Sequence, residues 1–174
     1  MRLEGRKIAV LAEDLFEDLE LWYPVLRMRE EGAEVLVLGT GKSEYHGKHG
    51  LSVEADMKVD DASPEDFQAV IIPGGYSPDR MRRHKPLLDF VRGASDSGSV
   101  VAFICHAGWV PISAGIVEGR RVTSFFSIAD DLRNAGAKWV DEEVVEDGNL
   151  ISSRDPRDLP AFCLAIIAAL SNSE

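Results

Sequence analysis

The sequence predicts an α/β fold built around a mostly parallel sheet. Short apolar runs rich in β-branched residues alternate with longer segments of helical period, which is the pattern of successive βαβ units. These short runs are apolar at nearly every position, as strands covered on both faces must be. The length of 174 residues suits one domain with a full core, so we expect residues 1–174 to fold as a single domain.

The first half of the chain contains three of the four predicted buried strands, which cover residues 8–12, 35–38, 69–72 and 100–104. A helix is expected over residues 19–31, with Gly32 as its stop signal. We interpret its apolar residues as the face toward the sheet, namely Leu19, Trp22, Tyr23, Leu26 and Met28. Residues 45–56 alternate in polarity and contain two glycines, which indicates a small β excursion at the sheet edge.

The second half continues the alternation. Helices are predicted over residues 86–97, directly after Cys105, and over residues 128–134. Asp147 and Gly148 form a hairpin signal between two short strands, at residues 144–146 and 150–152. A closing helix is expected over residues 158–171, because its apolar residues recur at helical spacing.

The charge balance narrows the possible partners. The chain has 19 basic and 30 acidic residues, a formal net charge of -11, so its field repels phosphate backbones and anionic lipid. We therefore expect neither nucleic acid nor a membrane surface as a partner. The two cysteines and the lack of an apolar signal core in residues 1–7 favour a reducing, cytoplasmic location.

Cys105 is the strongest candidate for a reactive group. It directly follows the predicted strand at residues 100–104 and precedes small residues that permit a sharp entry into a helix. Such an elbow exposes a nucleophile at the carboxyl end of the sheet and frees backbone N–H groups for an oxyanion. A helix N-terminus also favours the thiolate. The alternative is a buried structural cysteine, which is how we interpret Cys163 within the closing helix.

Two loops are expected to meet Cys105 at the carboxyl edge of the sheet. Glu17 lies in the loop after the first strand, where a protonated carboxyl group could donate a hydrogen bond to the thiolate. Its alternative role is to complement the dipole of the following helix. Gly75, in the glycine pair after the third strand, is a candidate oxyanion donor, although glycine pairs also serve simple tight turns.

Cofactor signals are weak. His46 and His49 flank Gly47 and Lys48, but a metal site needs a third ligand, so we expect no metal. The sequence has no Walker loop, no dinucleotide-binding glycine fingerprint and no CxxC motif, so we expect no cofactor.

Several ordered motifs together resemble the PfpI family of the class I glutamine-amidotransferase-like superfamily. The motifs are Phe-Glu-Asp at residues 16–18, Pro-Gly-Gly at 73–75 and Ala-Phe-Ile-Cys-His at 102–106. The likeness runs from the first strand to the closing helix. It implies a flavodoxin-like three-layer sandwich with Cys105 as nucleophile on the elbow and Glu17 as its carboxyl partner.

The resemblance also implies roles for three further groups. His106 matches the histidine next to the nucleophile, and we expect its ring to point away toward a subunit boundary while its backbone N–H and that of Gly75 bind the oxyanion. Asp79 matches the position of a glutamate that completes a triad from a neighbouring subunit in peptidase-like members, and is one methylene shorter. Members assemble as dimers or hexamers, so the resemblance implies a homo-oligomer.

Three functions are compatible with these residues. The first is a stress-protection enzyme of deglycase or glyoxalase type, acting on small carbonyl compounds or glycated groups through a covalent intermediate on Cys105. The second is an ATP-independent intracellular cysteine peptidase. The third is a non-enzymatic redox sensor or holdase in which Cys105 is oxidised to a sulfinate beside Glu17.

Overall fold

A seven-stranded sheet forms the centre of the computed structural model, which describes residues 1–172. The strand order is β10-β11-β7-β6-β1-β2-β5, and every pairing is parallel except that of β10 with β11. The strands are β1 Lys7–Ala12, β2 Glu34–Gly39, β5 Met57–Lys58, β6 Ala69–Ile72, β7 Val100–Ile104, β10 Val144–Asp147 and β11 Leu150–Ser153. The four predicted buried strands and the hairpin near residue 147 are confirmed.

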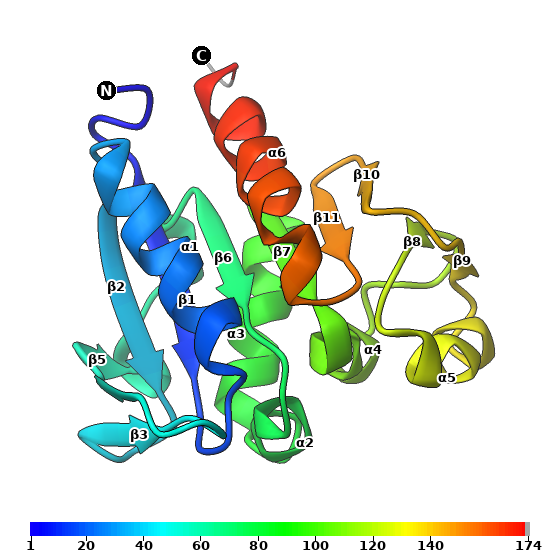
Figure 1. Cartoon of the computed structure of the whole chain (residues 1–174), viewed down its shortest axis with the longest axis horizontal. Coiled ribbons are helices and arrows are strands. Elements are labelled where there is room, and N and C mark those ends of the chain that lie inside the picture. The colour runs from blue at the N-terminus through cyan, green and yellow to red at the C-terminus, as the bar shows by residue number, and fades with distance from the viewer. Residues whose placement is uncertain (173–174) are drawn as a thin grey trace.

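Helices cover both faces of this sheet, so the predicted three-layer α/β sandwich is confirmed (Figure 1). The helices are α1 Asp18–Glu30, α2 Ser77–Met81, α3 Lys85–Asp96, α4 Trp109–Ala114, α5 Ala129–Asn134 and α6 Leu159–Ser171. Single turns of 3-10 helix lie between them: η1 Val59–Asp61, η2 Pro64–Asp66, η3 Cys105–Gly108, η4 Phe126–Ile128 and η5 Pro156–Asp158. Over the described residues, none of the helices is both long and apolar enough to cross a membrane.

Alternation along the strands divides the core into two halves. In β1, Ile8 and Val10 pack with α1 and α6, whereas Ala9 and Leu11 pack with α3 and α4. Figure 1 shows α1 and α6 side by side on the near face of the sheet and α3 on the far face. Both faces of the central strands are therefore buried, which explains why these strands are continuously apolar.

Two small sheets lie outside the main one. The predicted β excursion at residues 45–56 is an antiparallel hairpin of β3 Glu44–His46 and β4 Ser52–Glu54. The other small sheet pairs β8 Arg121–Val122 with β9 Lys138–Trp139, two strands too short for the sequence pattern to indicate. The β3–β4 hairpin matters for function because its connecting loop reaches the carboxyl end of β1.

The face of α1 that packs on the sheet differs from the predicted one. Leu19, Tyr23 and Leu26 are exposed, with relative accessibilities of 56%, 36% and 59%. The buried face instead contains Glu20, Leu21, Pro24, Val25 and Met28. The prediction was wrong for these three residues and right for Met28, and Trp22 is partly buried against the core. Because α1 has apolar residues around most of its circumference, their spacing alone does not define the inner face. This rotation carries Glu20 inward.

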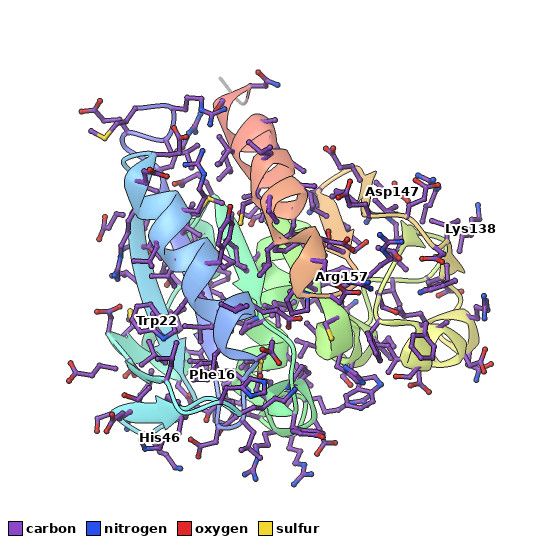
Figure 2. All side chains as sticks on the ribbon, in the orientation of Figure 1. Phe16, Trp22, His46, Lys138, Asp147 and Arg157 are labelled. Carbon is purple, nitrogen blue, oxygen red and sulfur yellow. The ribbon has the colours of Figure 1, made fainter. Side chains whose placement is uncertain are left out.

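The order of the strands brings three loops together. β1 lies between β2 and β6, so the strands that follow β2 and β5 in the chain are added on the opposite side of β1. Where the direction of strand addition reverses in this way, a crevice opens at the carboxyl ends of the strands. Phe16, in the loop after β1, forms bridges with both Gly47 and Gly75. Figure 2 shows Phe16 below the first turn of α1. The backbone of Phe16, whose side chain is fully buried, thus joins the loops that follow β1, β3 and β6.

Candidate active site

Cys105 lies on a strained turn at the carboxyl end of β7. It is the first residue of η3 and has a φ of 63°, in the left-handed region that non-glycine residues rarely adopt. Only 8% of the residue is exposed, and the backbone N–H groups of Gly75 and His106 donate toward its sulfur. A conformation that costs about 1–3 kcal/mol typically marks a functional position. The geometry is that of the predicted elbow.

The glycine pair after β6 allows the neighbouring loops to approach Cys105. Gly75 has a φ of 82°, and a Cβ there would lie 2.5 Å from the backbone nitrogen of Glu17. A Cβ on Gly74 would lie 2.4 Å from Oε2 of Glu20 and 2.9 Å from Cβ of Cys105. Neither position has room for a side chain, so both glycines are required by the packing around the sulfur.

The carboxyl group beside Cys105 belongs to Glu20. Glu20 is fully buried, and its Oε2 accepts a hydrogen bond of 2.7 Å from the backbone N–H of Gly74. Its other oxygen, Oε1, is buried without a hydrogen-bond partner within residues 1–172. Oε2 of Glu20 and Cβ of Cys105 lie against the same side of Gly74, and the carboxyl group and the thiol each shift the pKa of the other. Glu20 is therefore the group that can exchange a proton with the sulfur.

The prediction that Glu17 contacts Cys105 is wrong. Glu17 is the N-cap residue of α1, and its Oε2 lies 3.0 Å from Nζ of Lys48 and 3.4 Å from Nε2 of His49. Its side chain thus turns toward the loop between β3 and β4 at the rim of the site. Glu20 follows one helical turn later, and the rotation of α1 directs it inward. The i, i+3 spacing from the loop acid is the sequence signal that could have identified it.

Burial governs the ionisation of this pair. It raises the pKa of Glu20 from the usual 4.5 to about 8, and the nearby Glu17 charge acts in the same direction. Burial also raises the pKa of Cys105, and a Glu20 carboxylate raises it further, whereas the N–H groups of His106 and Gly75 oppose this. The Glu20 carboxylate and the Cys105 thiolate are therefore unfavourable at the same time. The thiolate forms most readily when Glu20 is protonated and can donate to the sulfur.

The raised pKa of Glu20 predicts that the protein loses stability as the pH rises from 4.5 to about 8. Between pH 4.5 and about 8 the unfolded carboxyl group is ionised while the folded one remains protonated, so the free energy of unfolding falls as pH rises through this window. The Glu20→Gln variant should lack most of this fall, which is on the order of 5 kcal/mol. Urea denaturation at a series of pH values measures it. The variant Glu17→Gln should retain most of the fall, because burial is the larger cause of the raised pKa of Glu20. Profiles of the same slope for wild type and Glu20→Gln would contradict the assignment.

His106 contributes its ring as well as its backbone to the site. Nδ1 lies 3.3 Å from Sγ of Cys105, and Nε2 lies 3.3 Å from Oγ of Ser127. The ring stacks on Phe125, with centroids 5.0 Å apart, and contacts Trp109 edge-on. The expectation that the ring points away from the nucleophile is therefore wrong, because the aromatic neighbours hold it over the sulfur. Burial, followed by the charge of Lys48, lowers the pKa of His106, so the imidazole is neutral at pH 7.

Asp79 lies apart from these groups. It belongs to the short helix α2, and its carboxylate hydrogen bonds with Arg83 on the surface. About half of its side chain is exposed, at 47%. The role of Asp79 as an acid for His106 of a neighbouring subunit stays a prediction. Within residues 1–172, His46 and His49 belong to no group of three His, Cys, Asp or Glu side chains that could hold a metal ion.

The strained cysteine, its buried carboxyl neighbour and the parallel sheet define an α/β protein with a nucleophile-elbow cysteine. The model of the DJ-1/PfpI family matches residues 6–169, and the chain belongs to this family. The resemblance noted in the sequence is confirmed.

Named relatives connect the family to chemistry. The chain is 43% identical over 164 residues to Deglycase PfpI from Pyrococcus furiosus, covering 94% of this chain and 99% of the relative. It is 42% identical over 160 residues to YraA from Bacillus subtilis, named as a candidate cysteine protease, covering 91% and 94%. The crystal structure of Drosophila melanogaster DJ-1beta superposes with a TM-score of 0.90 at 27% identity, covering 97% of this chain and 91% of that one. The relatives' names indicate an enzyme.

Proposed function

We propose that this protein is a cysteine-dependent enzyme that acts on reactive carbonyl compounds, in the manner of a glyoxalase or deglycase. The observation that carries the proposal is the environment of Cys105, where a buried carboxyl group and two backbone N–H groups all face the sulfur of a strained residue. This arrangement supplies a nucleophile, a proton donor and an oxyanion site without a cofactor. The name of the Pyrococcus furiosus relative supports the same chemistry.

The reaction begins with the addition of the Cys105 thiolate to an aldehyde carbon. A C–S bond forms, and the carbonyl π electrons move to oxygen, where the N–H groups of Gly75 and His106 stabilise the negative charge. Protonated Glu20 is the nearest acid and gives its proton to this oxygen, which yields a hemithioacetal.

The product is released by proton transfer and hydrolysis. With methylglyoxal, a base removes the proton from C1 of the hemithioacetal, the C2 oxygen takes up a proton, and an enediol forms. The base then returns its proton to C2 while the C1 hydroxyl loses its own proton, which leaves a lactoyl thioester on Cys105. Neutral His106, with Nδ1 at 3.3 Å from the sulfur, is placed to act as that base. Water then cleaves the C–S bond, and the released thiol returns a proton to Glu20, which restores the starting state. One methylglyoxal and one water thus give one lactate and one proton.

A peptidase is the second candidate, and the contact between Cys105 and the ring of His106 favours it. The same thiolate would attack an amide carbonyl, with His106 protonating the leaving amine. Within the described part of the chain, Nε2 of His106 meets the hydroxyl of Ser127 where a peptidase triad places an acid. We rank the carbonyl substrates first because protonated Glu20 gives the site a proton donor next to the sulfur and the Pyrococcus furiosus relative is named a deglycase.

A substrate panel separates these functions. Wild-type protein is given methylglyoxal, the hemithioacetal formed from methylglyoxal and a small thiol, and a fluorogenic peptide. We expect enzymatic production of lactate from the first two at rates well above that of peptide cleavage. Lactate must be measured directly, because hemithioacetals also dissociate without an enzyme. Peptide cleavage without lactate would favour the peptidase, and turnover of no substrate would favour the redox sensor or holdase.

A further inference from the structure

Lys48 lies on the loop between β3 and β4, at the rim of the site, where its side chain meets Glu17. Its backbone N–H donates to the carbonyl oxygen of Phe16 at 2.9 Å, and Phe16 forms a bridge with Gly75. Gly75 in turn donates its N–H toward Sγ of Cys105. The loop that carries Lys48 is thus fixed to the same backbone that surrounds the sulfur, and the ammonium group has a defined position at the mouth of the site.

The ammonium group of Lys48 retains capacity to bind a ligand. Nζ lies 3.0 Å from Oε2 of Glu17 and 5.3 Å from the centre of the Tyr76 ring. Within residues 1–172, Glu17 is the one residue that accepts a hydrogen bond from Nζ. An ammonium group has three N–H donors, so Nζ can donate to a ligand as well. The Lys48 side chain is 28% exposed, and Tyr76, at 63% exposed, adds an open aromatic face beside it.

The charge of Lys48 reaches the reacting groups. It contributes to the lowered pKa of His106 after burial, it acts on the carboxyl group of Glu20, and it attracts a Cys105 thiolate. Lys42, in contrast, forms its ion pair with Asp14 and is 61% exposed. The net charge of -11 repels anionic compounds from the protein as a whole. The positive charge of Lys48 at the rim therefore favours the binding of an anionic compound at this site.

We propose that Lys48 binds the carboxylate of anionic substrates, so that the site prefers aldehydes and glycation adducts that carry a carboxylate near the reacting carbonyl. The preference rests on the proposed reaction at Cys105. The substrate carboxylate replaces or shares Glu17 as the partner of Nζ, with its aldehyde carbon at the sulfur. Because one carboxylate exchanges for another, the ammonium group keeps a counter-ion throughout.

Two alkylating reagents test this selectivity independently of turnover. Iodoacetate and iodoacetamide both transfer a two-carbon group to a thiolate, which displaces iodide, but only iodoacetate is anionic. The ratio of their rate constants at Cys105, measured by mass spectrometry, should fall about fivefold in Lys48→Met, the size expected for one partly exposed charge contact. If Lys48→Met slows the reactions of both reagents equally, Lys48 affects only the reactivity of the thiolate, and the proposal is overturned.

Three further variants sharpen the comparison. Lys42→Met removes the same charge from a lysine paired with Asp14 and should leave the ratio unchanged. Lys48→Arg should preserve the ratio, and Glu17→Gln should raise it by removing the competing carboxylate. A lower ratio in Lys42→Met as large as that in Lys48→Met would indicate an effect of net charge alone and would contradict the proposal.

Protection of Cys105 from alkylation by reversibly binding aldehydes extends the test to carbonyl substrates. Glyoxylate and glycolaldehyde are small aldehydes that differ in charge, and each slows alkylation by iodoacetamide if it adds to Cys105. Glyoxylate should protect wild type at about fivefold lower concentration than it protects Lys48→Met, whereas glycolaldehyde should protect both equally. Loss of this difference overturns the proposal for Lys48. Absence of lactate formation, with the difference intact, instead overturns the proposed function alone.

Discussion

Replacement of Cys105 by Ala is expected to reduce the formation of lactate from methylglyoxal by about a thousandfold or more, because the covalent route disappears with the nucleophile. No second thiol can replace it, since Cys163 is 1% exposed within α6 and burial raises its pKa to about 12. The measurement is steady-state kcat/KM for lactate production, with the fold of each variant checked by circular dichroism.

Cys163→Ala is the matched control for this experiment. It removes the other thiol of the chain from a packed position inside α6, so turnover should persist while the protein loses some stability. If Cys105→Ala keeps more than about a tenth of the wild-type rate, catalysis does not proceed through a thiolate at the elbow, and the proposed mechanism is wrong.

The second large effect is expected at Glu20. Glu20→Gln preserves the shape of the side chain but removes the transferable proton, so kcat/KM should fall about a hundredfold. The pH profile distinguishes this role from a structural one. Wild-type activity should decline above about pH 8, where Glu20 ionises and its charge opposes the thiolate, whereas the residual activity of Glu20→Gln should lack that decline.

Glu17→Gln tests the alternative assignment within the same loop and helix. Its carboxylate pairs with Lys48 at the rim, so we expect a change of only a fewfold in kcat/KM for the neutral substrate methylglyoxal. A larger loss in Glu17→Gln than in Glu20→Gln would restore the interpretation drawn from the sequence and contradict the one drawn from the structure.

The sheet was predictable because its central strands are buried on both faces. β1, β6 and β7 are apolar at every position from Ile8, Ala69 and Val100 onward, which leaves no other plausible structure for such short runs. The elements that the sequence did not reveal are short, such as the two-residue strand β5. Their backbone hydrogen bonds depend on neighbours distant in sequence, and two residues carry no periodicity.

The candidate site was only partly predictable. Cys105 directly follows β7 and Gly75 lies three residues after the end of β6, so their place at the carboxyl edge of the sheet could be predicted from chain order. Glu20 lies inside α1, and its contact with the sulfur depends on a helix rotation that exposes Leu19 and Leu26. The ring orientation of His106 depends on packing against aromatic residues elsewhere in the chain, such as Phe125. The order of the elements in the sequence predicts where the backbone of these residues lies. The directions of the Glu20 and His106 side chains depend instead on tertiary packing.

The central claim is that the sulfur of Cys105 bonds covalently to the carbonyl carbon of the substrate. Carbon-13 NMR of the protein with labelled methylglyoxal tests this directly. We predict a resonance from a sulfur-bound tetrahedral carbon or a thioester carbon that saturates with protein concentration, persists in Cys163→Ala and is absent from Cys105→Ala. Turnover of methylglyoxal by wild type without such a species, or the same resonance in Cys105→Ala, would contradict the account.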